Sequence, residues 1–215
     1  MTRCRSCIAS LALVAVLAPP SPGGARAEEA HCHDHAAPPP GAPGRPARDP
    51  LARSVKRYAV PRVTLLDQDG RSVQLRDVLA PDRPVALNFI FTTCTTICPV
   101  MSATFAGLRE RLGDGDGGLR MISITIDPEH DRPAVLKAYA RRFGADPAWS
   151  FYTGSPEEVR NVLTAFEALA GDKVEHRPVT LLRSAHGEEW VRLDGLAGAG
   201  ELAAVLRPLL AQNEP

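Results

Sequence analysis

Two closely spaced cysteines are the residues of this chain with the clearest chemical potential. Cys94 and Cys98 are separated by residues 95–97 and followed directly by Pro99. In a turn of helix-like geometry this spacing lets both sulfurs approach one point, and two thiolates form a soft donor pair that suits Cu(I) and also Zn(II). The same sulfurs could instead close as a disulfide. The pair therefore favours a metal site or a redox-active dithiol over two inert buried thiols.

A histidine far along the chain could complete such a metal site. Two thiolates leave a copper ion short of a ligand, and an imidazole is a common partner in copper sites of mixed softness. His176 lies in residues 173–178, on the loop before a predicted hairpin strand. We therefore predict that Cys94, Cys98 and His176 form one metal site.

Three further side chains lie near this predicted site or in similar loops. Asp127 falls at the carboxyl end of a predicted strand, the edge at which open α/β sheets gather their sites. There it could orient a ligand or tune the thiolates without touching the metal; equally, it could cap the following turn with Pro128. His130 lies in a polar connection and His186 in a predicted hairpin turn, so we expect both to be exposed.

A second group of metal-binding residue types stands near the N-terminus. It consists of His31, Cys32, His33 and His35, with Asp34 among them. These soft or borderline donors could form a second copper site on a tether. They could also be a disordered polar tail, and the lone thiol of Cys32 could form an intermolecular disulfide.

The predicted elements place the cysteine pair where a buried strand passes into a helix. Residues 85–91 are an almost unbroken apolar run, as expected for a strand covered on both faces. Pro99 suits a first helical position, and the apolar spacing within residues 101–112 predicts one face of a helix. Unsatisfied amides and the helix dipole at such a helix start stabilise a thiolate and lower its pKa.

The remaining elements follow the order of a thioredoxin-like fold. We predict strands at 58–66 and 72–75 with a turn at 67–70, a strand at 119–126, a helix at 134–143, a strand at 151–153, a helix capped by Ser155, a hairpin of 179–183 and 189–193, and a helix at 200–210. Alternation of strands and helices alone would give only an α/β sandwich. The N-terminal β-hairpin extension and the inserted helix favour the peroxiredoxin-like branch of the fold. In this fold the loop that carries His176 packs beside the cysteines.

The N-terminal part is predicted to be separate from this domain. Residues 1–27 resemble a secretory signal peptide, with a basic start, a short apolar stretch and a small-x-small cleavage sequence. Residues 28–52 are predicted to be a disordered His/Cys tail and Pro-rich linker, and residues 53–213 the thioredoxin-like domain. We expect an exported protein, periplasmic or otherwise extracytoplasmic, with a membrane anchor as the alternative if the signal is not cleaved.

Export would leave an odd number of cysteines. Cys4 and Cys7 would leave with the signal peptide, and Cys32, Cys94 and Cys98 would remain. A full set of internal disulfides is then impossible. Unpaired thiols persist in an oxidising compartment mainly where chemistry or a metal needs them.

The charge balance argues against nucleic acid as a partner. The chain has 25 Lys and Arg residues against 25 Asp and Glu residues, so its formal net charge is zero. A nucleic-acid-binding protein would carry a basic patch or stripe. No small organic substrate is implied by the motifs either.

Three segments carry a resemblance to the Sco/SenC family. They are FIFTTCTTICPVMS at 89–102, ISITIDPEHDRP at 122–133, and Glu175-His176. The resemblance covers about residues 58–210, which is nearly all of the predicted domain. It implies a thioredoxin-like fold.

The same resemblance implies a copper site and its ligands. Copper, as Cu(I) or Cu(II), would be bound by Cys94, Cys98 and His176, and Asp127 would be the acidic residue of the Asp-Pro-Glu segment. The implied role is a metallochaperone that loads copper into the binuclear site of cytochrome c oxidase subunit II, or that first reduces the cysteines of that site. Thiol reductant proteins are then expected partners. The chain has Thr95 where the family usually has Pro, so another exported copper protein could also be the receiver.

Two other functions compete with copper delivery. A thiol-disulfide oxidoreductase would use Cys94 and Cys98 without metal, and His176 would be dispensable to it. A peroxidase of the peroxiredoxin type is suggested by Thr95-x-x-Cys98-Pro99. That pattern requires a proline four residues before the threonine, where this chain has Phe91.

Overall fold

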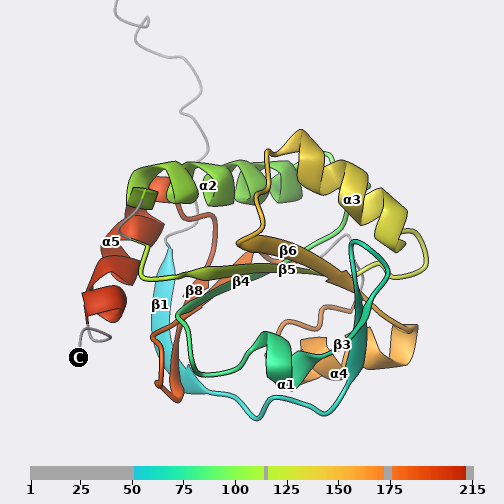
Figure 1. Ribbon diagram of the computed structural model, residues 1–215, viewed down its shortest axis with the longest axis horizontal. Coiled ribbons are helices and arrows are strands. Elements are labelled where there is room, and N and C mark those ends of the chain that lie inside the picture. Colours follow the sequence, from blue (N-terminus) through green and yellow to red (C-terminus); the bar gives the residue numbers. More distant parts are fainter. Residues whose placement is uncertain (1–50, 114–115, 172–175, 212–215) are drawn as a thin grey trace, which may run out of the picture. The chain divides into compact units, whose positions relative to one another are not determined.

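A mixed β-sheet with helices on both faces makes up the part of the chain that the computed structural model describes, residues 51–113, 116–171 and 176–211 (Figure 1). The strands are β1 (Ala52–Arg57), β2 (Thr64–Asp67), β3 (Ser72–Gln74), β4 (Val85–Ile90), β5 (Arg120–Thr125), β6 (Trp149–Thr153), β7 (Val179–Arg183) and β8 (Glu189–Asp194). The helices are α1 (Leu75–Val78), α2 (Ile97–Leu112), α3 (Pro133–Arg142), α4 (Pro156–Ala165) and α5 (Ala199–Ala211). The strand order is β1-β8-β7-β4-β5-β6-β2-β3. Strands β4, β5 and β6 are parallel, and the other neighbours are antiparallel.

Strand β4 lies in the middle of the sheet and contributes to two cores. All six of its residues are buried, because helices cover both faces of the sheet. Ala86 and Ile90 belong to the core under α2, α3 and α5. Leu87 and Phe89 belong to the core on the opposite face, with α1 and α4. Because side chains of β4 enter the cores on both faces of the sheet, the carboxyl end of this strand is held between two packed layers.

Most predicted elements are present, and the α/β class is confirmed. The expected strand at 119–126 is β5, the helix at 134–143 is α3, and the hairpin of 179–183 and 189–193 is formed by β7 and β8. Strands β2 and β3 form the expected N-terminal hairpin, and β2 joins the sheet beside β6. The helix predicted from Ser155 is α4, and the hydroxyl of Ser155 caps it by accepting from the amide of Glu158.

The prediction was wrong at the start of the domain. The strand expected at 58–66 is shorter, and β2 begins only at Thr64. An additional strand that was not expected, β1, lies ahead of it at Ala52–Arg57. Strand β1 pairs with β8 along its whole length at the edge of the sheet. Its sequence, ARSVKR, is mostly polar and exposed, and an edge strand of this kind needs no apolar alternation. Helix α1 at Leu75 was not expected either.

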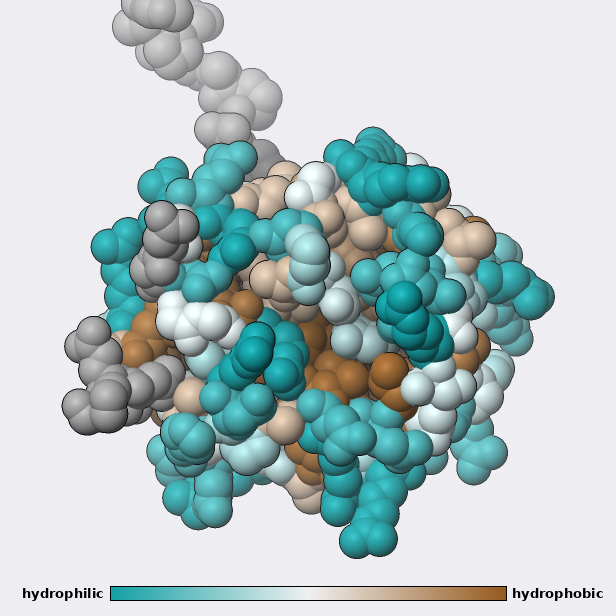
Figure 2. Space-filling view, in the orientation of Figure 1, coloured by the Kyte–Doolittle hydropathy of each residue, from teal (hydrophilic) through white to brown (hydrophobic). Residues whose placement is uncertain are grey.

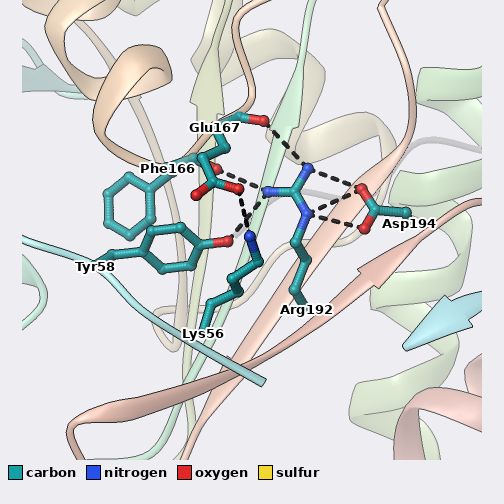
Figure 3. Close-up of polar contacts among 6 residues, drawn as sticks. All are labelled: Lys56, Tyr58, Phe166, Glu167, Arg192 and Asp194. Atoms are coloured by element: carbon teal, nitrogen blue, oxygen red, sulfur yellow. Dashed lines mark hydrogen bonds and ion pairs between the residues drawn. The ribbon is translucent and has the colours of Figure 1, made fainter. Parts of the chain in front are cut away.

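A buried arginine connects β8 to the end of α4 (Figure 3). Arg192 donates hydrogen bonds to the carbonyl oxygens of Phe166 at 2.8 Å and Glu167 at 3.2 Å. It also donates to the hydroxyl of Tyr58 at 3.2 Å and, through Nε, to the carboxylate of Asp194 at 2.9 Å. The guanidinium thereby satisfies backbone groups that α4 leaves without helical partners. It fixes the position at which the chain leaves α4.

Replacing this arginine is expected to destabilise the domain. Arg192→Met keeps much of the side-chain volume but leaves buried carbonyl oxygens without donors, so we expect the free energy of unfolding to fall by about 2–3 kcal/mol. Arg57→Met is the matched control, because Arg57 is exposed and pairs with Glu189 at the surface, 3.2 Å away. Such a pair contributes about 0–1 kcal/mol. Urea denaturation followed by circular dichroism measures both losses, and equal losses would contradict the role given to Arg192.

The predicted N-terminal segments lie mostly outside the described residues. This holds for the signal peptide (1–27), for the His/Cys tail and for all but the end of the linker (28–52), so these remain predictions. Within the described ranges, none of the helices combines the length and the apolar character that crossing a membrane requires. Figure 2 shows one face of the molecule, on which hydrophilic side chains surround a smaller hydrophobic area.

Candidate functional site

The two cysteines lie on the connection between β4 and α2. The amide of Cys94 donates to the carbonyl oxygen of Phe91 at 3.2 Å, which closes a turn just after the strand. Cys98 is the second residue of α2, and its amide donates to the sulfur of Cys94 at 3.4 Å. Both thiols are free; Cys98 is fully buried and Cys94 is 9% exposed. The structure thus brings the predicted pair together at the start of a helix.

Cys94 is the more acidic thiol of the pair. Burial raises its pKa, but hydrogen bonds from the backbone amides of Cys98 and Thr96 outweigh burial, and the net result is a lowered pKa. The hydroxyl of Thr96, 3.7 Å from the sulfur, acts in the same direction. Amides at a helix start stabilise a thiolate in this way. Cys94 is therefore the side chain of the pair best prepared to act as a thiolate.

Cys98 is held as a neutral thiol. Burial, with smaller contributions from Cys94 and the negative charge of Asp131, raises the pKa of Cys98 to about 12, although a hydrogen bond from the backbone of Phe91 lowers it. The two thiols are therefore unequal: the pKa of Cys94 is lowered and its residue is 9% exposed, whereas the pKa of Cys98 is raised and its residue is fully buried. This asymmetry is typical of a dithiol in which one sulfur attacks and the other resolves.

The asymmetry predicts a selective alkylation. In the reduced, folded domain, iodoacetamide is expected to modify Cys94 first, about tenfold or more faster than Cys98, because the thiolate is the nucleophile. Mass spectrometry of peptides from a time course at neutral pH measures the two rates. In urea the two thiols should react at similar rates, and equal rates in the folded protein would contradict the assigned asymmetry.

His176 lies next to the end of β4, where it is buried. Its Nε2 is 3.1 Å from the carbonyl oxygen of Phe89, an acceptor, so Nε2 carries the proton and Nδ1 is the unprotonated nitrogen. Burial lowers the pKa of His176, partly offset by the carbonyl of Phe89. The ring of Phe91 packs edge-on against the imidazole, with 6.4 Å between ring centroids. The imidazole is thus neutral and carries a lone pair that could bind a metal.

The described residues do not close a three-ligand site. No group of three or more His, Cys, Asp or Glu side chains that could hold a metal ion occurs among them. Phe91 links the two halves, because its carbonyl binds the amide of Cys94 while its ring contacts His176. The two sulfurs suit a soft ion such as Cu(I). The imidazole of His176 is not grouped with them as a metal-binding set in the described part of the chain.

Asp127 lies in the turn after β5. Its carboxylate is 3.2 Å from Nδ1 of His130, and its carbonyl oxygen accepts the amides of His130 and Asp131. These contacts lie within the turn that follows β5, and the role of Asp127 at the cysteine site stays a prediction. His130 and His186 are both exposed, as predicted.

A second carboxylate beside the cysteine turn was missed by sequence reasoning. Asp131 is fully buried and accepts hydrogen bonds from the amide of Thr92 at 3.0 Å and from the hydroxyl of the same residue. The hydroxyl of Thr125 donates to it at 2.5 Å. The only signal in the sequence was the spacing of Asp131 from Asp127, within the segment that follows a buried strand.

The second predicted metal site was not described by the structure. His31, Cys32, His33 and His35 all lie outside the described residues, so the copper site on a tether stays a prediction.

Comparison with protein families and curated proteins gives one consistent result. A family model described as SCO1/SenC matches residues 53–209. The SCO1 protein homolog of Bacillus subtilis is 35% identical over 129 residues, which are 59% of this chain and 63% of that protein. The SCO2-like protein RT0576 of Rickettsia typhi is 33% identical over 108 residues, 49% of this chain and 50% of that protein. The chain thus matches between half and two thirds of the length of these relatives.

Solved structures agree with the sequence comparisons. BsSco, described as a member of the Sco family of cytochrome c oxidase assembly proteins with a disulfide switch, has a TM-score of 0.60 at 30% identity, covering 72% of this chain and 95% of that chain. Yeast Sco1 with copper bound has a TM-score of 0.62 at 23% identity, covering 74% of this chain and 97% of that chain. This similarity is one of fold. The predicted thioredoxin-like fold is therefore confirmed.

Proposed function

The chain belongs to the SCO1/SenC family, and from this we propose that it is an exported copper-binding metallochaperone in cytochrome c oxidase assembly. Copper is its cargo, and Cys94, Cys98 and His176 are the proposed ligands. The proposed receiver is the binuclear copper site of oxidase subunit II, or a site in another exported copper protein. The description of BsSco as an oxidase assembly protein and the copper-bound structure of yeast Sco1 support the proposal.

The observation that carries the proposal is the free cysteine pair at the start of α2. Cys94 has a lowered thiol pKa and accepts a hydrogen bond from the amide of Cys98. Two sulfurs from one turn are soft donors, which favour Cu(I) over harder divalent ions. Binding through Cys98 releases a proton, because the pKa of that thiol is about 12.

His176 supplies the third donor in this proposal. In the structure its Nε2 lies on the carbonyl oxygen of Phe89, which sets the tautomer and leaves the lone pair on Nδ1. The imidazole contacts the ring of Phe91, and the carbonyl oxygen of Phe91 accepts the amide of Cys94. A neutral imidazole needs no deprotonation before it binds a metal.

Complementation in the cell tests the proposed function. Deleting the gene is expected to lower cytochrome c oxidase activity, and the wild-type chain should restore it whereas Cys94→Ser should not. Oxidase activity measured in membranes, with haem and copper content as controls, gives the result. Full oxidase activity in the deletion strain at low copper would contradict a role in oxidase assembly.

A thiol-disulfide oxidoreductase is the second candidate function. The unequal pKa values of Cys94 and Cys98 favour it, since a redox pair of this kind needs no third ligand. It would keep the cysteines of the receiving site reduced and would draw electrons from thiol reductant proteins. His176→Ala separates the two functions, because the variant should retain disulfide reductase activity but lose copper delivery.

Export and the tail belong to the same proposal. Residues 1–27 are proposed to be a cleaved signal peptide, so the exported protein should begin at Glu28. The following group of His31, Cys32, His33 and His35 is proposed as an additional copper-binding segment. N-terminal sequencing of the protein recovered from the extracytoplasmic fraction tests the cleavage. An intact N-terminus in the membrane fraction would favour an uncleaved anchor instead.

A further inference from the structure

Asp131 is a fully buried carboxylate that lies between the end of β5 and the start of α3. It receives three hydrogen bonds: from the amide and the hydroxyl of Thr92, and from the hydroxyl of Thr125. The amide of Thr92 can only donate, and because a carboxylate only accepts, both hydroxyls donate to it as well; an amide side chain would instead have to donate to one of the hydroxyls. Burying a carboxylate is costly unless its hydrogen bonds are made, and here both oxygens of Asp131 accept hydrogen bonds.

The two threonines lie on different segments of the chain. Thr125 is the last residue of β5, whereas Thr92 lies on the connection that leads from β4 to the cysteines. Thr92 directly follows Phe91, whose carbonyl oxygen accepts the amide of Cys94. Asp131 therefore joins the start of the cysteine turn to the end of the neighbouring parallel strand.

The amide of Ile126 donates to the carbonyl oxygen of Ile90 at 2.9 Å, so the ends of β4 and β5 are already in register. Beyond that point the parallel pairing stops, and the chain of β4 turns away towards α2. The contacts of Thr92 with Asp131 are the next ones along this connection. Without them, the connection at Thr92 would lose its hydrogen bonds to the segment that follows β5.

Asp127, the other buried carboxylate after β5, lies four residues earlier. Its side chain contacts His130 in its own turn, and its backbone organises the same turn. Asp131 is hydrogen-bonded directly to Thr92 of the connection that carries the cysteines.

We infer that Asp131 is a positioning residue, which through Thr92 holds the cysteine turn in the geometry that lets the sulfurs of Cys94 and Cys98 act as a pair. The inference deepens the proposed function, since the pair is its proposed site, but it concerns the dithiol itself. Positioning acts through effective concentration, because a misplacement of about 1 Å can cost on the order of a hundredfold in a reaction between held groups.

The experiment measures the equilibrium with glutathione in the absence of metal. Two thiols of the protein and one glutathione disulfide give one protein disulfide and two glutathione thiols, so two electrons and two protons pass to glutathione. Asp131→Asn is expected to lower the equilibrium constant for protein disulfide formation at least tenfold, a rise in reduction potential of about 30 mV for a two-electron couple. A folded Asp131→Asn variant with the wild-type constant would overturn the inference.

Two threonine variants separate positioning from general loss of stability. Thr92→Val and Thr125→Val each remove one hydroxyl bond to the same carboxylate, so both should lower stability in urea. Only Thr92→Val is expected to lower the equilibrium constant, about threefold, and Thr92→Ser should restore it. Equal constants in the two valine variants would contradict the inference even if Asp131→Asn does not fold.

This outcome is independent of the copper proposal. A wild-type copper affinity together with an unchanged glutathione equilibrium in Thr92→Val would reject the positioning role alone. Absence of copper binding in the wild type, together with the expected shift in Thr92→Val, would reject the metal site alone.

Discussion

Replacing Cys98 by serine is expected to lower the Cu(I) affinity of the reduced domain by more than about a hundredfold. Mutating a residue that only supports a metal ligand can already lower the affinity by about that much, and Cys98 is proposed as a ligand itself. A serine hydroxyl is a hard, protonated donor that a soft ion does not favour. Cys94→Ser should have an effect of the same size, because each variant leaves a single sulfur. Competition with a chromophoric Cu(I) chelator measures the affinities.

Ser102→Ala is the matched control for the cysteine variants. Ser102 is a buried residue of the same helix, and its hydroxyl lies 2.9 Å from the hydroxyl of Tyr139. Removing this hydroxyl disturbs the packing of α2 without removing a sulfur, so the Cu(I) affinity should stay within about twofold of wild type. A cysteine variant that binds Cu(I) as tightly as Ser102→Ala would contradict ligation by that sulfur.

Replacing His176 by alanine is expected to lower the affinity for Cu(II) by at least about tenfold to a hundredfold, and to change the spectrum of the bound ion. Cu(II) is harder than Cu(I) and depends more on a nitrogen donor. The imidazole is available for this role because burial lowers its pKa and its Nε2 is held by Phe89, leaving Nδ1 unprotonated. Electron paramagnetic resonance of the Cu(II) complex measures the change in ligands.

His130→Ala is the control for this variant. His130 is exposed and contacts Asp127, so its removal should leave the Cu(II) spectrum unchanged. Identical spectra for wild type, His130→Ala and His176→Ala would show that the imidazole of His176 does not bind the ion. Cys94 and Cys98 would then serve as a redox pair.

The cysteine turn could be predicted from the sequence because local signals agree there. An apolar run, two cysteines and a helical repeat follow one another, and each has a direct physical meaning in terms of burial, capping and the helix start. One detail differs. Helix α2 begins at Ile97, so Pro99 is its third residue rather than its first. Proline is tolerated there because the amides of the first turn have no helical partners.

The role of Asp131 could not be predicted, because it depends on the shape of a turn. Asp127 and Asp131 follow β5 in the same short segment. Since both are aspartates, residue type alone does not tell which of them contacts the cysteine connection. The carbonyl oxygen of Asp127 accepts the amide of Asp131 at 2.9 Å, and this turn brings Asp131 against Thr92. Sequence spacing alone does not tell which carboxylate faces the cysteine connection.

Strand β1 was missed for a different reason. Its residues alternate neither in hydrophobicity nor in β-branching, and pairing with β8 alone makes the segment a strand. Backbone hydrogen bonds to a neighbour leave no trace in the sequence of an exposed edge strand. The proposed approach of His176 to the cysteines likewise depends on tertiary packing around Phe91, which no local pattern encodes.

X-ray absorption spectroscopy of the Cu(I)-loaded domain examines the proposed ligand set at the metal itself. We expect two sulfur neighbours and one nitrogen neighbour in the wild type, and two sulfur neighbours without the nitrogen in His176→Ala. Identical spectra for the two proteins, with sulfur neighbours alone, would contradict the convergence of Cys94, Cys98 and His176 on one ion.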